Sequence, residues 1–156
     1  SAEAFLSGAR EKRIEIRSFR DGFFPYVGAD IKEFFEQLKN QVQPDIIFTH
    51  NRNDMHQDHR LLAELTWNSF RDHMILAYEI PKYDGDLGSP NVFVHLDAAT
   101  CHNKLELLKS NFKTQTVKDW FDDELFMALL RIRGMECRAP DGYAEAFYSR
   151  KMVLHV

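Results

Sequence analysis

Strand-like and helix-like hydrophobic patterns alternate along this chain, and their order limits the folds that the sequence can adopt. Residues 45–49 (Asp-Ile-Ile-Phe-Thr) form a short apolar run rich in branched and aromatic side chains, which is typical of a buried parallel strand. Apolar residues at helical spacing precede this run in residues 30–42 and follow it in residues 58–70. Strands that alternate with helices in this way favour an α/β sandwich with a mostly parallel sheet.

Further elements are predicted on both sides of this central segment. The alternation of polar and apolar residues over 13–17 indicates a short strand, and the Asp21-Gly22 pair that follows is typical of a loop. The remaining predictions are a helical piece over residues 1–8, strands near 74–80 and 91–96, helices from Asp97 and from about Lys118 to Gly134, and an extended tail over 144–156.

Length and composition fit one soluble globular domain. The chain has 156 residues, of which 44% are hydrophobic and 28% charged. A net charge of −4 without a block of Lys and Arg argues against a nucleic-acid partner, and no apolar run approaches the ~20 residues of a membrane helix. Cys101 and Cys137 lie far apart and outside any CxxC motif, so neither a disulfide framework nor a cysteine zinc site is predicted. With no signal peptide visible, these features fit a cytoplasmic setting.

A polar segment, residues 50–59, follows the apolar run and leads into the next predicted helix. It holds three of the seven histidines and two aspartates. Ligands bind at the carboxyl ends of strands in parallel α/β sheets, and imidazole and carboxylate groups are the usual ligands of catalytic zinc. Asp58, which lies between two histidines in the sequence, can orient an imidazole. The alternative is a solvated turn in which Asp58 only caps the helix.

The order of elements in this segment resembles a known family. An apolar strand, a polar loop and His56-Gln57-Asp58-His59 at the start of a helix are similar to the second signature of the PIG-L/LmbE-like de-N-acetylases. Arg20-Asp21-Gly22 and residues 143–147 (Tyr-Ala-Glu-Ala-Phe) resemble two further parts of the family's pattern. The resemblance implies a hydrolase that uses Zn²⁺, or another divalent metal, to remove an acetyl group from an N-acetylated amino sugar or glycoconjugate.

The resemblance also implies roles for individual side chains. His59 would ligate the metal, and His56 would stabilise the oxyanion or protonate the leaving amine. Asp58 would hydrogen-bond a histidine and fix its orientation. Substrate contacts are expected from five further side chains: His50, Asp54, Arg20, Asp21 and Glu145.

One family feature is missing from this sequence. The first signature, His-Pro-Asp-Asp, occurs nowhere in the chain. In family terms the chain is therefore expected to be one domain, residues 1–156, with a Rossmann-like three-layer sandwich that is N-terminally incomplete and lacks its first two strands and first helix. We accordingly predict an open sheet edge at residues 45–49, with His50, His56 and His59 crowded at its carboxyl end. Weak zinc binding is also predicted, because His59 is the only strong ligand.

Two other interpretations of the cluster remain open at this point. Residues 54–59 also resemble the His-x-His-x-Asp-His motif of metallo-β-lactamase-fold hydrolases, with Asp54 in place of the first histidine. That fold usually has small residues after the motif, whereas Arg60 and two leucines follow here. The second alternative is a catalytically inactive sugar-binding or structural remnant that kept the fold but lost the metal centre.

Overall fold

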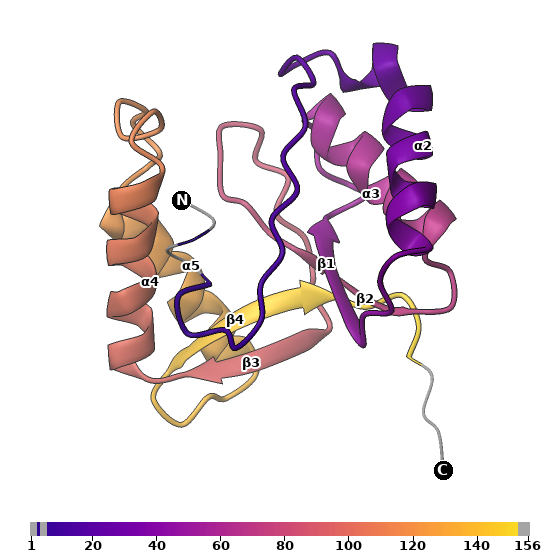
Figure 1. Ribbon diagram of the computed structural model, residues 1–156. Helices are drawn as coiled ribbons and strands as arrows, with labels where there is room; N and C mark the ends of the chain where they lie inside the picture. Colours follow the sequence, from indigo (N-terminus) through magenta and orange to yellow (C-terminus); the bar gives the residue numbers. More distant parts are fainter. Residues whose placement is uncertain (1–2, 4–5, 153–156) are drawn as a thin grey trace. The chain divides into compact units, whose positions relative to one another are not determined.

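The computed structural model describes residue 3 and residues 6–152, and the chain forms two compact units. The first unit comprises Phe19–Ile80, Asp84–Val92 and Ala146–Val156, and the second comprises Ser1–Ser18, Pro81–Tyr83 and Phe93–Glu145. The order of elements along the chain is η1 (Phe24–Val27), α2 (Gly28–Lys39), β1 (Ile46–His50), α3 (Gln57–Ser69), β2 (Met74–Tyr78), β3 (Val92–Leu96), α4 (Ala98–Asn111), α5 (Asp123–Glu136) and β4 (Tyr143–Tyr148) (Figure 1). None of the described helices combines the length and the apolar character that a membrane crossing requires.

The four strands form one sheet with the order β1-β2-β4-β3. β1 and β2 are parallel, with Ile46 opposite Met74 and His50 opposite Tyr78, whereas β2 and β4 are antiparallel. The prediction of a mostly parallel sheet is therefore wrong, because the sheet formed by the described residues is mostly antiparallel. The burial pattern explains the difference: Ala144 and Ala146 alternate with more exposed residues along β4, as expected for an antiparallel strand with one solvated face.

Within the part of the chain that the structure describes, β1 lies at one edge of the sheet, as predicted for residues 45–49. The strand predicted over residues 13–17 is wrong, since these residues have no regular secondary structure. Their charged side chains pair locally, with Arg13 Nη2 2.7 Å from Glu15 Oε1, and Ile16 is 83% exposed. The alternating pattern of residues 13–17 therefore does not correspond to a strand with one buried apolar face. The predicted helical piece over residues 1–8 falls partly on Ser1, Ala2, Ala4 and Phe5, which lie outside the described residues.

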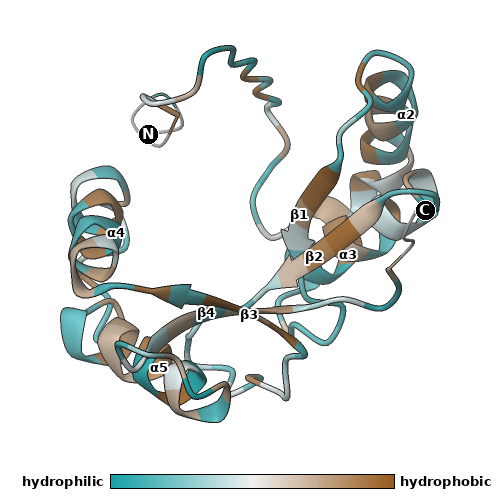
Figure 2. Cartoon of the chain, turned by 90° about the horizontal axis from the view of Figure 1, so that it is seen from below, coloured by the Kyte–Doolittle hydropathy of each residue, from teal (hydrophilic) through white to brown (hydrophobic). Residues whose placement is uncertain are grey.

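In the core of the first unit, α3 packs against β1, and β1 pairs with β2. Figure 2 shows these two strands as adjacent apolar segments, and the buried side chains include Ile31 of α2, Ala63 of α3 and Ile75 of β2. The Thr49 and Thr66 hydroxyl oxygens are 3.0 Å apart in the interior, which ties the end of β1 to α3. Because α3 connects two parallel strands, its first turn lies at their carboxyl ends, where sites form in parallel sheets.

The helix boundaries follow capping residues, with some shifts from the predictions. α2 begins at Gly28 after Val27, so Asp30 lies in its first turn rather than at the N-cap. Asp97 caps α4 as predicted, because its carboxylate accepts a hydrogen bond of 2.7 Å from the Thr100 N–H. α5 starts later than predicted, at Asp123, and continues past Gly134. Gly134 is needed for packing, since a Cβ there would lie 2.2 Å from the Gly142 carbonyl oxygen.

We expect the two cysteines to differ strongly in reactivity. Cys101 in α4 is completely buried, and this burial raises the pKa of its thiol, whereas Cys137 is partly exposed. The thiolate is the nucleophile, so iodoacetamide at pH 8 should alkylate Cys137 at least about tenfold faster than Cys101 in the native protein. Peptide mass spectrometry over a time course measures both rates. Equal rates in native protein would contradict the burial of Cys101, and urea-unfolded protein provides the control in which the difference should disappear.

Candidate functional site

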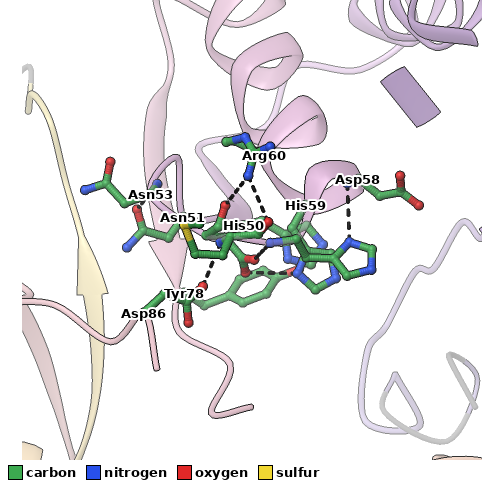
Figure 3. A network of polar contacts seen from close by, with 11 residues as sticks. His50, Asn51, Asn53, Asp58, His59, Arg60, Tyr78 and Asp86 are labelled. Atoms are coloured by element: carbon green, nitrogen blue, oxygen red, sulfur yellow. Dashed lines mark hydrogen bonds and ion pairs between the residues drawn. The ribbon is translucent and has the colours of Figure 1, made fainter. Parts of the chain in front are cut away.

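The loop between β1 and α3 is held in shape by its own polar groups. The Asp54 N–H donates to the Asn51 carbonyl at 3.1 Å, and the Asn53 N–H donates to the Asn51 side-chain oxygen at 3.0 Å. Asn side chains commonly stabilise turns in this way. From α3, Arg60 Nη1 donates to the carbonyls of Asp54 and Met55, at 3.1 and 2.9 Å (Figure 3). These hydrogen bonds hold the loop in shape from within, through Asn51, and from α3, through Arg60.

Three histidines lie together at the carboxyl end of β1. The rings of His50 and His59 stack with their centroids 3.9 Å apart and their planes 5° apart, and the rings of His56 and His59 are 4.4 Å apart. His50 is the last residue of β1, while His56 and His59 come from the start of α3. The prediction that these three side chains crowd at this end of the strand is confirmed.

Asp54 links the histidines to one another. Its carboxylate is 5% exposed, with Oδ2 2.9 Å from His59 Nδ1 and Oδ1 accepting a hydrogen bond of 2.8 Å from the His56 N–H. His50, Asp54 and His59 each offer a ligand atom, and these atoms lie within 4.8 Å of one another. Two imidazoles and one carboxylate are a donor set that suits zinc and related divalent ions. The residues present therefore fit a metal, and they add two donors to the single ligand expected from the sequence.

Tyr78 belongs to this cluster, although the sequence analysis missed it. Its hydroxyl is 3.3 Å from His50 Nε2, and burial, with the negative charge of Asp54 as a smaller contribution, raises the pKa of Tyr78 to about 12. The phenol therefore stays neutral at physiological pH. Tyr78 is the last residue of β2, directly opposite His50. The position of Tyr78 could have been inferred from the sequence, because the carboxyl ends of neighbouring parallel strands meet at one edge of a sheet.

His56 is the N-cap residue of α3. Its Nδ1 accepts a hydrogen bond from the Asp58 N–H at 3.3 Å. A neutral imidazole whose Nδ1 is an acceptor carries its proton on Nε2. The capping contact thus fixes the tautomer of His56 and leaves Nε2–H as a donor.

The contacts of the Asp58 side chain differ from the expected hydrogen bond to a histidine. Its side chain is 2% exposed, and it accepts hydrogen bonds from the backbone N–H groups of Gly22, at 2.6 Å, and Phe24, at 3.1 Å. Gln57 Nε2 also donates to the Gly22 carbonyl at 3.1 Å. Asp58 therefore fastens the turn around Gly22 to the first turn of α3, and Asp54 is the carboxylate that contacts an imidazole.

The other three expected contact residues lie in different surroundings. The Arg20 guanidinium is 3.7 Å from the centroid of the Phe23 ring, and Asp21 is in the turn with Gly22 that Asp58 fastens. Glu145 belongs to the second unit, where its carboxylate is 2.5 Å from Lys104 Nζ. The structure thus brings His50, Asp54, His56 and His59 together and places Arg20 and Asp21 in a turn attached to the same helix. Their roles toward a substrate stay predictions.

Residues 1–70 match the family model of PIG-L, the GlcNAc-PI de-N-acetylases. This match contains the β1–α3 segment with its His-x-Asp-His motif, so the resemblance to the PIG-L/LmbE family is confirmed. The C-terminal stretch over residues 143–147 lies outside the match. A comparison with curated proteins gives no significant match.

Solved structures share the fold of this chain. An N,N′-diacetylchitobiose deacetylase from Pyrococcus horikoshii has a TM-score of 0.64 at 19% identity, over 94% of this chain and 60% of its own. A 4-carboxy-2-hydroxymuconate hydratase from Pseudomonas putida has 0.59 at 16%, over 82% and 61%. The zinc-inhibited form of a teicoplanin deacetylase has 0.61 at 10%, over 90% and 57%. The chain thus spans less than two thirds of each structure.

These structural likenesses establish the fold and leave the reaction open. Two of the three proteins are deacetylases and one is a hydratase, so the same fold supports more than one chemistry. The donor groups in the site determine which reaction the chain can support.

Proposed function

We propose that this chain carries the metal site of a de-N-acetylase, a divalent-metal hydrolase that acts on an N-acetylated amino sugar or glycoconjugate. The observation that carries the proposal is the His50–Asp54–His59 donor set at the carboxyl end of β1. The match of residues 1–70 to a de-N-acetylase family supports the reaction type. Two structural neighbours whose names specify chitobiose and teicoplanin deacetylation support a sugar-linked acetamide as the substrate class.

The metal would be held by His50, Asp54 and His59. A divalent ion such as zinc supplies activated water and polarises an amide carbonyl. Asp54 Oδ2 already lies 2.9 Å from His59 Nδ1, close enough for both atoms to bind the same ion.

His56 is the group that we assign to the reacting amide. When water adds to the acetyl carbon, negative charge develops on the carbonyl oxygen, and the Nε2–H of His56 donates a hydrogen bond to it. When the C–N bond breaks, the leaving nitrogen would take up the proton that the attacking water gives up, so His56 stays neutral as a hydrogen-bond donor, and the products are acetate and a free amine. The contact between His56 Nδ1 and the Asp58 N–H holds the ring in the tautomer that this role needs.

Acetate release tests the proposed function. Protein supplied with one equivalent of zinc should release acetate from N-acetylglucosamine or N,N′-diacetylchitobiose, as measured by NMR, and not from N-acetyl-lysine. A chelator should stop the release, and added zinc should restore it. Absence of acetate from both sugars would contradict the proposal and favour a sugar-binding or structural remnant of the fold.

A further inference from the structure

A cleft of about 700 Å³ lies along α3 in the first unit. Its lining residues are different from those of the histidine cluster. They come from the β1–α3 loop, from α3 and the segment after it, and from the segment after β4: Arg52, Glu64, Trp67, Asn68, Arg71, Arg150 and Lys151.

The charge of this cleft is opposite to that of the whole chain. Four cationic side chains and one carboxylate line it, although the chain has a net charge of −4. Among the residues that the structure describes, none of these four cations has a carboxylate within ion-pair distance. Four cations against one carboxylate leave the cleft with a net positive charge, which raises the local concentration of anions. The cleft is therefore suited to an anionic ligand.

Local contacts arrange the cations while leaving their donors available. The Arg150 guanidinium lies 5.8 Å from the centroid of the Trp67 ring, a distance typical of a cation–π contact. Lys151 Nζ donates to the Arg71 backbone carbonyl and so ties the segment after β4 to the end of α3. The only side-chain contact described for the Arg71 guanidinium is a long one, 3.4 Å to Asn68 Oδ1. Both guanidinium groups thus retain free N–H donors.

We propose that this cleft binds a ligand that carries a phosphate group. Three guanidinium groups exceed the charge of a single carboxylate, whereas a phosphate ester has up to about two charges and three acceptor oxygens. The planar fork of arginine matches phosphate oxygens in pairs. The half-buried indole of Trp67 adds an apolar wall for the rest of the ligand.

This site is separate from the proposed metal centre. Trp67 follows His59 by eight residues on α3, which corresponds to roughly 12 Å along the helix axis. The inference does not rest on the proposed deacetylase function, because the lining residues and their charges carry it alone.

Fluorescence of Trp67 provides the test. The chain has two tryptophans, so the Trp120→Phe variant keeps Trp67 as the only reporter. Inorganic phosphate and glucose 6-phosphate, titrated at low salt, should each give a saturable signal change, and glucose should give none. The double variant Arg71→Gln, Arg150→Gln should weaken binding by at least about tenfold, since hydrogen bonds to charged groups are the strong ones. Removal of two exposed charges of the second unit, by Lys113→Gln and Lys118→Gln, should change binding by less than about twofold.

A second experiment distinguishes a lipid headgroup from a soluble phosphate ester as the ligand of the cleft. A lipid headgroup is identified if the protein co-sediments with phosphatidylinositol vesicles but not with phosphatidylcholine vesicles, and if the Arg71→Gln, Arg150→Gln variant loses this co-sedimentation. Binding of glucose 6-phosphate without co-sedimentation would identify a soluble phosphate ester. The proposal is overturned if none of the phosphate probes binds saturably, or if the arginine variant binds them as well as the lysine control does.

Discussion

Replacement of His56 by alanine is expected to lower the rate of acetate release by about 10²–10³-fold, because loss of one oxyanion-stabilising donor typically has this effect. Zinc affinity should change by less than about threefold, since His56 lies outside the His50–Asp54–His59 donor set. Steady-state rates of acetate release, together with zinc titrations of the same protein, measure both quantities.

Two further variants separate this role from the structural role of His56 as the N-cap of α3. His56→Asn keeps a side-chain acceptor at the N-cap but has no imidazole, so it should preserve folding and still lose the rate. His102→Ala removes an exposed histidine from α4 and should leave the rate unchanged. Full activity in His56→Ala would remove His56 from the mechanism.

Asp58→Ala is expected to lower the free energy of unfolding by about 2–4 kcal/mol, because it leaves the part-buried N–H groups of Gly22 and Phe24 without their acceptor. Asp58→Asn keeps one acceptor oxygen of similar size and should cost about half as much. The exposed Asp119 gives a matched control, Asp119→Ala, with an expected change below about 0.5 kcal/mol. Urea denaturation measures all three. A loss in Asp58→Ala no larger than that of the control would show that this carboxylate does not hold the turn.

The sequence was sufficient to locate β1, α3 and the polar loop between them. The apolar run, the loss of hydrophobicity at His50 and the helical spacing after Asp58 each correspond to a feature of the structure. The three histidines were predicted to meet because strand ends and helix starts coincide in a βαβ connection. Local patterns determine such features, and so they can be inferred without tertiary information.

Features that depend on contacts between distant segments were not predictable in the same way. Strand direction across the sheet is set by how the chain returns after α5, and apolar patterns do not encode it. The partner of His59 is a further example, since both Asp54 and Asp58 are close to it in sequence. Only the fold shows that the Asp58 carboxylate accepts a hydrogen bond from Gly22, 36 residues away, and that Asp54 contacts the ring of His59. Tyr78 joined the site through its register with His50.

If His50, Asp54 and His59 form a metal centre, the protein should retain zinc through dialysis, so its zinc content is the quantity to measure. The protein is dialysed against a small excess of zinc and then against metal-free buffer, and bound zinc is measured by atomic spectroscopy. About one zinc per chain is expected in the unmodified protein and in the His102→Ala control, and less than about a tenth of that in His59→Ala, which loses one of three donors. Unmodified protein that retains no zinc, or His59→Ala protein that retains as much as the control, would contradict a metal centre at these three residues.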